Sequence, residues 1–175
     1  MLDLKDLNED TRIKMLEEVD FDENNNNLFL SPRLNHDGVL KYPQLLKKSI
    51  KEHDVAWLIN ELSGDLFKSH EPRKTKSGVI QAKVPSNASQ LLAEGEFNRF
   101  YCRGLCLFAI QEEKPFVEVY RAKEVSRPRI ESEKKIGLQL DPNFVLNDLR
   151  DKIGDETLSE ICMPNSGLSL CLPNI

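Results

Sequence analysis

The sequence predicts an α+β fold, in which an N-terminal helical portion packs on a small mixed sheet with a long central helix. Three observations lead to this class. Helical spacing of apolar residues dominates residues 1–66, whereas the clearest strand patterns come after residue 78. Between the first of these strands and the next, residues 86–113 form one long helical stretch. This order of elements lacks the regular strand–helix alternation of a parallel α/β sheet.

Length and composition are those of one globular domain. The chain has 175 residues, of which 39 % are hydrophobic and 30 % charged. We expect a single domain over residues 1–175, with a helical subdomain at 1–66 and a mixed α+β core at 67–175. No apolar run approaches the length of a membrane span, and the N-terminus lacks the pattern of a secretory signal, so we expect a cytoplasmic protein without membrane contact.

The cysteines predict buried thiols rather than a metal site. Cys102, Cys106, Cys162 and Cys171 stand among apolar neighbours, and their spacings do not fit a zinc knuckle. His36, His53 and His70 lie in polar stretches and are expected at the surface. The sequence therefore predicts no metal and no cofactor.

The first third predicts three helices. "NEDTRIKMLEEVDF" begins with polar caps and ends before an asparagine run. After the short extended segment "LFLSP" and a turn at "LNHDG", the next helix is expected over residues 41–53, with Pro43 in its first turn. The third covers residues 54–64, with Asp54 as N-cap, Gly64 as stop and Trp57 in the core.

The remainder predicts strands around the long helix. Residues 68–78, "KSHEPRKTKSG", lack periodicity and are expected to form an exposed loop before the strand "VIQAKVP". Ser86 is the expected N-cap of the long helix, within which a glycine indicates a kink or a close backbone contact. "KPFVEVYRAKEV", "LQL" and "LSLCLP" are expected strands, and "DPNFVLNDLRDKIG" is a helix that starts at Asp141.

Charge is distributed unevenly along the chain. Residues 1–66 carry a net charge of −6, residues 67–135 carry +5, and residues 136–175 carry −4. A basic middle between acidic ends indicates either an anionic partner or ends that fold back on the middle as internal ion pairs.

The stretch "EGEFNRFYCRG", residues 94–104, marks the candidate site. On a helix, Glu96, Arg99 and Arg103 share one face. If this helix packs on the following strand, cations in and after that strand could converge with Arg99 and Arg103 around one pocket. Such a pocket would bind phosphate or carboxylate. The predicted ligand-binding residues are Arg99, Arg103, Arg121, Arg127 and Arg129. For catalysis, Glu96 is the candidate base and Tyr101 or Lys123 the assisting donor.

The function expected from this site is binding of nucleic acid or of a phosphate-bearing ligand, including cleavage without a metal. A metal-dependent nuclease fits poorly, because Glu118 and Lys123 would point to opposite faces of a regular strand. Binding without catalysis would use the same cations, helped by the exposed segment "EPRKTKSG". The alternative is a protein–protein interaction module or accessory subunit whose arginines are internal ion-pair anchors. No enzyme class is assigned.

Overall fold

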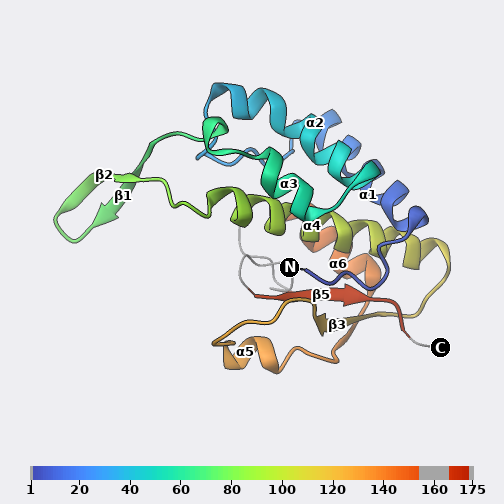
Figure 1. Ribbon diagram of the computed structural model, residues 1–175. Coiled ribbons are helices and arrows are strands. Elements are labelled where there is room, and N and C mark those ends of the chain that lie inside the picture. The colour runs from blue at the N-terminus through green and yellow to red at the C-terminus, as the bar shows by residue number, and fades with distance from the viewer. Residues whose placement is uncertain (1, 154–165, 174–175) are drawn as a thin grey trace.

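The computed structural model describes residues 2–153 and 166–173 and confirms the α+β class (Figure 1). The described residues are about 51 % helical and 16 % strand. The helices are α1 (Glu9–Asn24), α2 (His36–Glu52), α3 (Val55–Glu61), α4 (Ala88–Gln111), α5 (Ile130–Glu133) and α6 (Pro142–Asp151), with a 3-10 turn, η1 (Gly64–Leu66). The strands are β1 (His70–Thr75), β2 (Gly78–Lys83), β3 (Val117–Arg121), β4 (Gln139–Leu140) and β5 (Leu168–Cys171).

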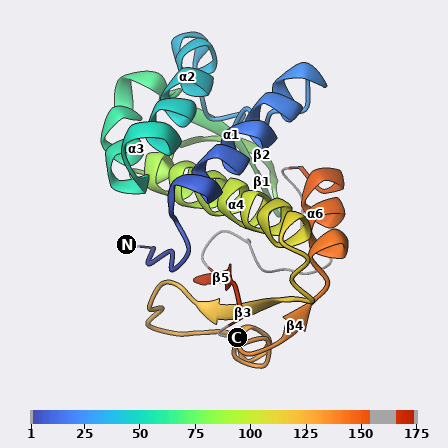
Figure 2. The ribbon, with the colours of Figure 1, turned by 90° about the vertical axis from the view of Figure 1, so that its right-hand side faces the viewer.

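Helix α4 runs through the middle of the molecule. Helices α1, α2 and α3 cover one side of it, and the sheet of β3, β4 and β5 lies on the other side, with α6 alongside (Figures 1 and 2). One hydrophobic cluster extends from Met15 in α1 through Phe97 and Leu105 in α4 to Leu170 in β5. The helical portion and the sheet therefore pack on different sides of α4 and share one hydrophobic core with it.

The N-terminal helices begin at side-chain caps. Asn8 Oδ1 accepts from the backbone N–H of Thr11, and Asp54 caps α3 in the same way, as predicted. The predicted start of the second helix is wrong: α2 begins at His36, because Asn35 caps it, and residues 36–38 of the predicted turn "LNHDG" already belong to the helix. Pro43 therefore lies inside α2, although proline lacks the N–H that a helix interior normally uses.

Gly104 lets α1 approach α4 closely. A Cβ atom at this position would lie 2.7 Å from the backbone nitrogen of Met15 and 3.0 Å from the carbonyl oxygen of Thr11. Real Cβ atoms do not come this near to backbone atoms, so any larger residue would push the two helices apart. The close backbone contact expected at a glycine in this helix is thus found at Gly104.

The three-stranded sheet has the order β4-β3-β5, and both of its pairings are antiparallel. Val117 and Val119 of β3 face the core, whereas Tyr120 packs with Leu2 and Leu4 of the N-terminal segment. The backbone N–H of Asp3 donates to the carbonyl oxygen of Ala122 at 2.7 Å. The chain start therefore packs against the sheet beside β3 and β5, and it also contacts α4, where the backbone N–H of Asp6 donates to the Tyr101 hydroxyl. All strand pairings among the described residues are antiparallel, in place of the mixed sheet expected.

A two-stranded hairpin replaces most of the predicted loop. β1 pairs antiparallel with β2, from His70 opposite Lys83 to Thr75 opposite Gly78. The expected strand "VIQAKVP" is β2, but its partner had been expected to lie in a loop. We call residues 70–83 the basic arm, and Figure 1 shows that it projects away from the body.

Other local predictions have mixed outcomes. Trp57 is only half buried and stacks on His53, with ring centroids 4.3 Å apart, so its predicted place in the core is wrong. The cap of α4 is Asn87 rather than Ser86. Cys102, Cys106 and Cys171 are buried and free, as predicted. Cys162 and Gly154 lie outside the described residues. Among the helices that the structure describes, none is long and apolar enough to cross a membrane.

Candidate functional site

Arg103 does not face a cavity. Its side chain is 0 % exposed, and its guanidinium group donates to Glu18 Oε2 at 2.7 Å and to both carboxylate oxygens of Asp22 at 2.6 and 2.8 Å. Arg150 of α6 also donates to Glu18. These four residues form what we call the buried ion cluster, which joins α1, α4 and α6. Burial alone would raise the pKa of Glu18, but hydrogen bonds from Arg150 and Arg103 hold it below its ordinary value.

Arg99 and Glu96 form a second buried pair on the same helix. Arg99 Nη1 lies 3.7 Å from Glu96 Oε1, and the guanidinium group also donates to the backbone oxygens of Leu149 and Lys152 at the end of α6. Burial raises the pKa of Glu96 to about 7, against the attraction of Arg99 and Arg103. Arg99 thus binds the carbonyl end of a helix, which carries partial negative charge.

Tyr101, Arg121 and Lys123 are also partnered by their own chain. The Tyr101 hydroxyl donates to the carbonyl oxygen of Leu170 at 3.0 Å, and burial raises its pKa. Arg121 pairs with Glu133, and Lys123 Nζ lies 2.6 Å from Glu94 Oε2. These contacts fasten β3 and the segment after it to neighbouring elements.

Arg127 and Arg129 are exposed in the turn before α5. Apart from the pair of Arg99 and Glu96, the eight predicted site residues therefore have different partners, and the described structure does not gather their charged groups around one open hollow. Arg103 faces α1, Arg99 faces the end of α6, and Arg121 faces α5. A role for these residues in binding or catalysis stays a prediction without a shared cavity to support it.

The basic arm carries several cations that make no contact with a carboxylate among the described residues. Four of its residues, Arg73, Lys74, Lys76 and Lys83, are basic and one, Glu71, is acidic. Its net charge is +3, against −8 for the rest of the chain. Within the described part of the chain, Lys74, Lys76 and Lys83 make no ion pair, and Arg73 pairs only with Glu71 at 3.2 Å. The arm thus gathers several unpaired cations on one projecting element.

The arm is fixed at its root. Arg33 Nε donates to Glu71 Oε2 at 2.6 Å, the backbone N–H of Lys68 donates to the carbonyl oxygen of Arg33, and Leu34 pairs with Phe67 as an isolated β-bridge. The hydrogen bonds of Arg33 and Arg73 lower the pKa of Glu71. A two-stranded hairpin is marginally stable alone, so these root contacts set the direction in which the arm projects.

The two faces of the arm differ in chemistry. Because opposite residues of an antiparallel pair point to the same side, the register divides the arm into two sets. One set, which we call the open face, is exposed along its whole length and contains no carboxylate: His70, Pro72, Lys74, Val79, Gln81 and Lys83. The other face is partly buried at the root, at Glu71 and Ala82. Only the open face presents cations along the full hairpin.

Pro72 and the lysines disfavour the addition of another strand to β1. Proline cannot donate a ladder hydrogen bond, and lysine on an edge strand opposes edge-to-edge pairing. The tip is a tight turn in which Thr75 Oγ1 donates to the carbonyl oxygen of Gly78 at 2.9 Å. Gly78 has φ of +129°, which a residue with a side chain rarely adopts. The sequence and the turn thus maintain an open, two-stranded ribbon.

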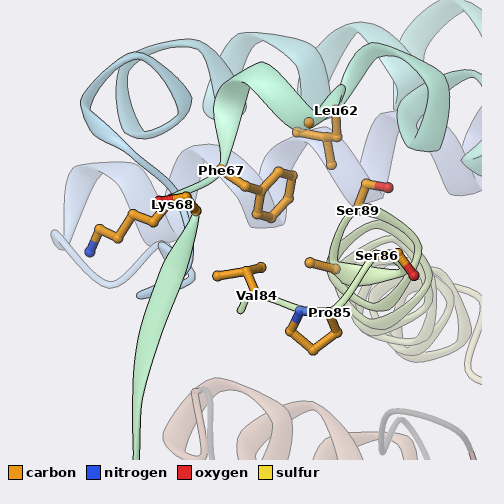
Figure 3. Close-up of a pocket in the computed structure, with 10 residues that line it drawn as sticks. Leu62, Phe67, Lys68, Val84, Pro85, Ser86 and Ser89 are labelled. Atoms are coloured by element: carbon orange, nitrogen blue, oxygen red, sulfur yellow. The ribbon is translucent and has the colours of Figure 1, made fainter. Parts of the chain in front are cut away.

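A small pocket of about 220 Å³ lies where the arm joins the body. In Figure 3, Leu62 of the body, Phe67 before β1 and Val84 after β2 surround it, and Ser86 and Ser89 stand at the start of α4. Lys68 lines the pocket, but its ammonium group donates to the carbonyl oxygen of Pro32 at 2.8 Å. The pocket is a gap with a mixed polar and apolar lining at the junction of three segments.

The candidate site is therefore the arm, and one signal for it was visible in the sequence: the exposed basic segment "EPRKTKSG". No group of three histidine, cysteine or acidic side chains able to hold a metal occurs in residues 2–153 and 166–173. Comparisons with protein families, with curated proteins and with solved structures found no match. The fold and the arm define an α+β protein with a projecting basic hairpin.

Proposed function

We propose that this protein binds nucleic acid through the basic arm, without catalysing a reaction on it. The observation that carries the proposal is that three lysines without an ion pair stand together on one element that projects from the body. Lys74, Lys76 and Lys83 make no ion pair among the described residues, whereas Arg103 and Lys123 are held by carboxylates of the same chain. Nucleic-acid affinity comes largely from lysine and arginine that neutralise phosphates.

Cleavage is not part of the proposal. The candidate base Glu96 and donor Tyr101 are both buried, and each is in contact with other groups of this chain. A phosphodiester would have to reach them through the helical layer or the sheet. The acidic body, net −8, would in turn repel phosphates and direct them to the arm.

A salt titration with an arm variant tests this function. Labelled duplex DNA, duplex RNA and single-stranded DNA are titrated at 50 and 200 mM salt with the protein and with Lys74→Gln/Lys76→Gln/Lys83→Gln. Three to four phosphate contacts predict that affinity falls about 40- to 150-fold over this range, from a slope of about −0.9 per contact. The triple variant should lose most of that slope.

The matched control replaces two exposed cations outside the arm, in Arg127→Gln/Arg129→Gln. This variant changes nearly as much charge but leaves the arm intact, so its binding should stay within about threefold of the unchanged protein. If the control loses binding and the arm variant keeps it, the site lies at the turn before α5. If no nucleic acid binds at 50 mM salt, the proposed function is wrong.

A protein-interaction role is the second candidate, and the apolar residues near the tip favour it. Val79 is 64 % exposed and Ile80 49 % exposed. A protein partner that covered either aliphatic side chain would remove its apolar surface from water. Should the arm serve self-association instead, sedimentation velocity would show a concentration-dependent species that Val79→Ser/Ile80→Ser removes, with no nucleic-acid binding.

A further inference from the structure

We propose that the open face of the arm enters the major groove of duplex DNA, with lysines on the phosphates and Gln81 and Val79 against the base edges. This inference rests on the proposed function and names the form of nucleic acid that the same site would take. It follows from the shape of the arm, the order of side chains along the open face and the residue types that the arm lacks.

The shape of the arm argues against most other ways of binding nucleic acid. The major groove of B-form DNA is about 12 Å wide and admits a two-stranded ribbon, whereas the major groove of A-form RNA is too deep and narrow for side chains to read. Neither edge of the arm pairs with a third strand in the described structure, and its side chains are exposed except near the root. The ribbon could therefore enter a groove without rearrangement of the body.

The arm also lacks what single strands require. Proteins that bind single-stranded nucleic acid stack the bases on aromatic side chains. Residues 70–83 contain no phenylalanine, tyrosine or tryptophan, and His70 lies at the root rather than at the tip. A cationic ribbon without stacking residues suits a duplex, whose bases are already stacked on each other.

Side chains on the open face follow an order that fits a groove. Lys83 stands at the root, Gln81 and Val79 follow along β2, and Lys74 lies opposite Val79. Residues 79 and 83 are separated by about 13 Å along the strand, which corresponds to about four base pairs. Glutamine reads adenine through two hydrogen bonds, and an apolar side chain contacts the methyl group of thymine. Gln81 thus lies between the levels of Lys83 and Lys74, and Val79 lies beside Lys74, so the open face is suited to A·T pairs next to its phosphate contacts.

Neighbouring residues on opposite faces provide a matched pair of variants. Val79 and Ile80 are adjacent in β2, both exposed, and paired with Lys74 and Arg73 of β1. Val79→Ala should weaken binding to an A·T-rich duplex about threefold or more, and Ile80→Ala should leave it unchanged. Gln81→Ala should reduce the preference for A·T over G·C duplexes about tenfold while the salt slope is kept, because glutamine carries no charge.

Blocking either groove tests the inference directly. We expect the unchanged protein to bind duplex DNA at least tenfold more tightly than duplex RNA or single-stranded DNA of the same sequence. Bulky glucosyl groups on C5-hydroxymethyl cytosines, which fill the major groove, should lower affinity at least tenfold, whereas the minor-groove ligand netropsin should not compete.

The outcomes separate this inference from the proposed function. Three results would overturn the assignment to the major groove but leave nucleic-acid binding intact. These are salt-dependent binding that prefers single strands or RNA, binding that netropsin removes, and binding that Ile80→Ala weakens more than Val79→Ala does. Absence of binding to every probe at 50 mM salt would overturn both. If the lysine variant merely aggregates and no probe binds the unchanged protein, the lysines serve solubility and both proposals fail.

Discussion

The buried ion cluster and the basic arm use the same kinds of side chain in opposite ways. In the cluster, Arg103 is fully buried and both of its acidic partners are almost so. In the arm, lysines stand on a ribbon with water on both sides. A buried guanidinium group must be paired because an unpaired buried charge is very costly, whereas an exposed ammonium group costs little to leave unpaired. Cations in the first region therefore hold the fold, and cations in the second remain available to a partner.

Removal of Arg103 should produce the largest effect in the molecule. Arg103→Ala leaves Glu18 and Asp22 buried beside each other, with only Arg150 to neutralise them. Breaking a buried pair in this way costs about 3–5 kcal/mol. For a chain of this size we expect Tm to fall by about 10 °C in a calorimetric scan.

The matched substitution in the arm is Lys74→Ala, which should change the free energy of unfolding by about 0.5 kcal/mol or less. Equal losses for the two variants would contradict the division between structural and free cations.

Glu96 predicts a pH effect on stability that runs opposite to that of Glu18. Its folded-state pKa, about 7, lies above the ordinary value of 4.5, so the protein is stabilised most below pH 4.5 and loses this contribution as the pH rises through 7. The difference between these two pKa values corresponds to about 3 kcal/mol in the free energy of unfolding. Between pH 5 and pH 8, the free energy of unfolding measured in urea should fall less for Glu96→Gln than for the unchanged protein.

The exposed residue Glu131 provides the control for this titration, because Glu131→Gln should leave the pH profile as it is. The lowered pKa of Glu18 has the opposite sign: its contribution is present above the ordinary pKa and is lost as the pH falls. A Glu96→Gln profile parallel to that of the unchanged protein would mean that Glu96 does not titrate in this range.

Gly104→Ala should have a smaller net effect at the same helix contact. The new Cβ would meet the backbone of α1 at Met15, and such overpacking costs about 1–3 kcal/mol. Alanine regains about 1 kcal/mol of helix propensity, so the expected loss is about 0–2 kcal/mol in urea unfolding. Gly64→Ala is the control, since nothing lies within 4 Å of its Cβ position. A more stable Gly104→Ala protein would show that α1 can shift without cost.

Local signals predicted most of the helices because caps and apolar spacing are properties of neighbouring residues. Asp54 and Asp141 cap the helices they were expected to cap. The first strand of the arm was missed because "HEPRKT" has no apolar alternation and contains a proline; its structure depends on pairing with β2. Strand propensity alone does not report such a partner.

The surroundings of the arginines were harder to predict because their partners are distant in sequence. Arg103 binds Glu18 and Asp22, which lie 85 and 81 residues earlier. The uneven charge did indicate internal pairing as one of two outcomes, and the acidic α1 does supply it. The packing of α1 on α4, which brings those carboxylates to Arg103, could not be predicted from the sequence.

The smallest expected effect concerns the root of the arm. Arg33→Ala removes the ion pair with Glu71. Both side chains of this pair are partly exposed, and such pairs contribute about 0.2–1 kcal/mol. Global stability should therefore change little, but local opening of the arm should increase up to about fivefold, because the pair acts only there. Hydrogen exchange of peptides covering residues 70–83 measures this opening. Lys14→Ala removes a comparable exposed pair with Glu17 in α1 and should leave exchange in the arm unchanged. Unchanged exchange in Arg33→Ala would show that the Leu34–Phe67 bridge and the backbone contacts hold the arm without the ion pair.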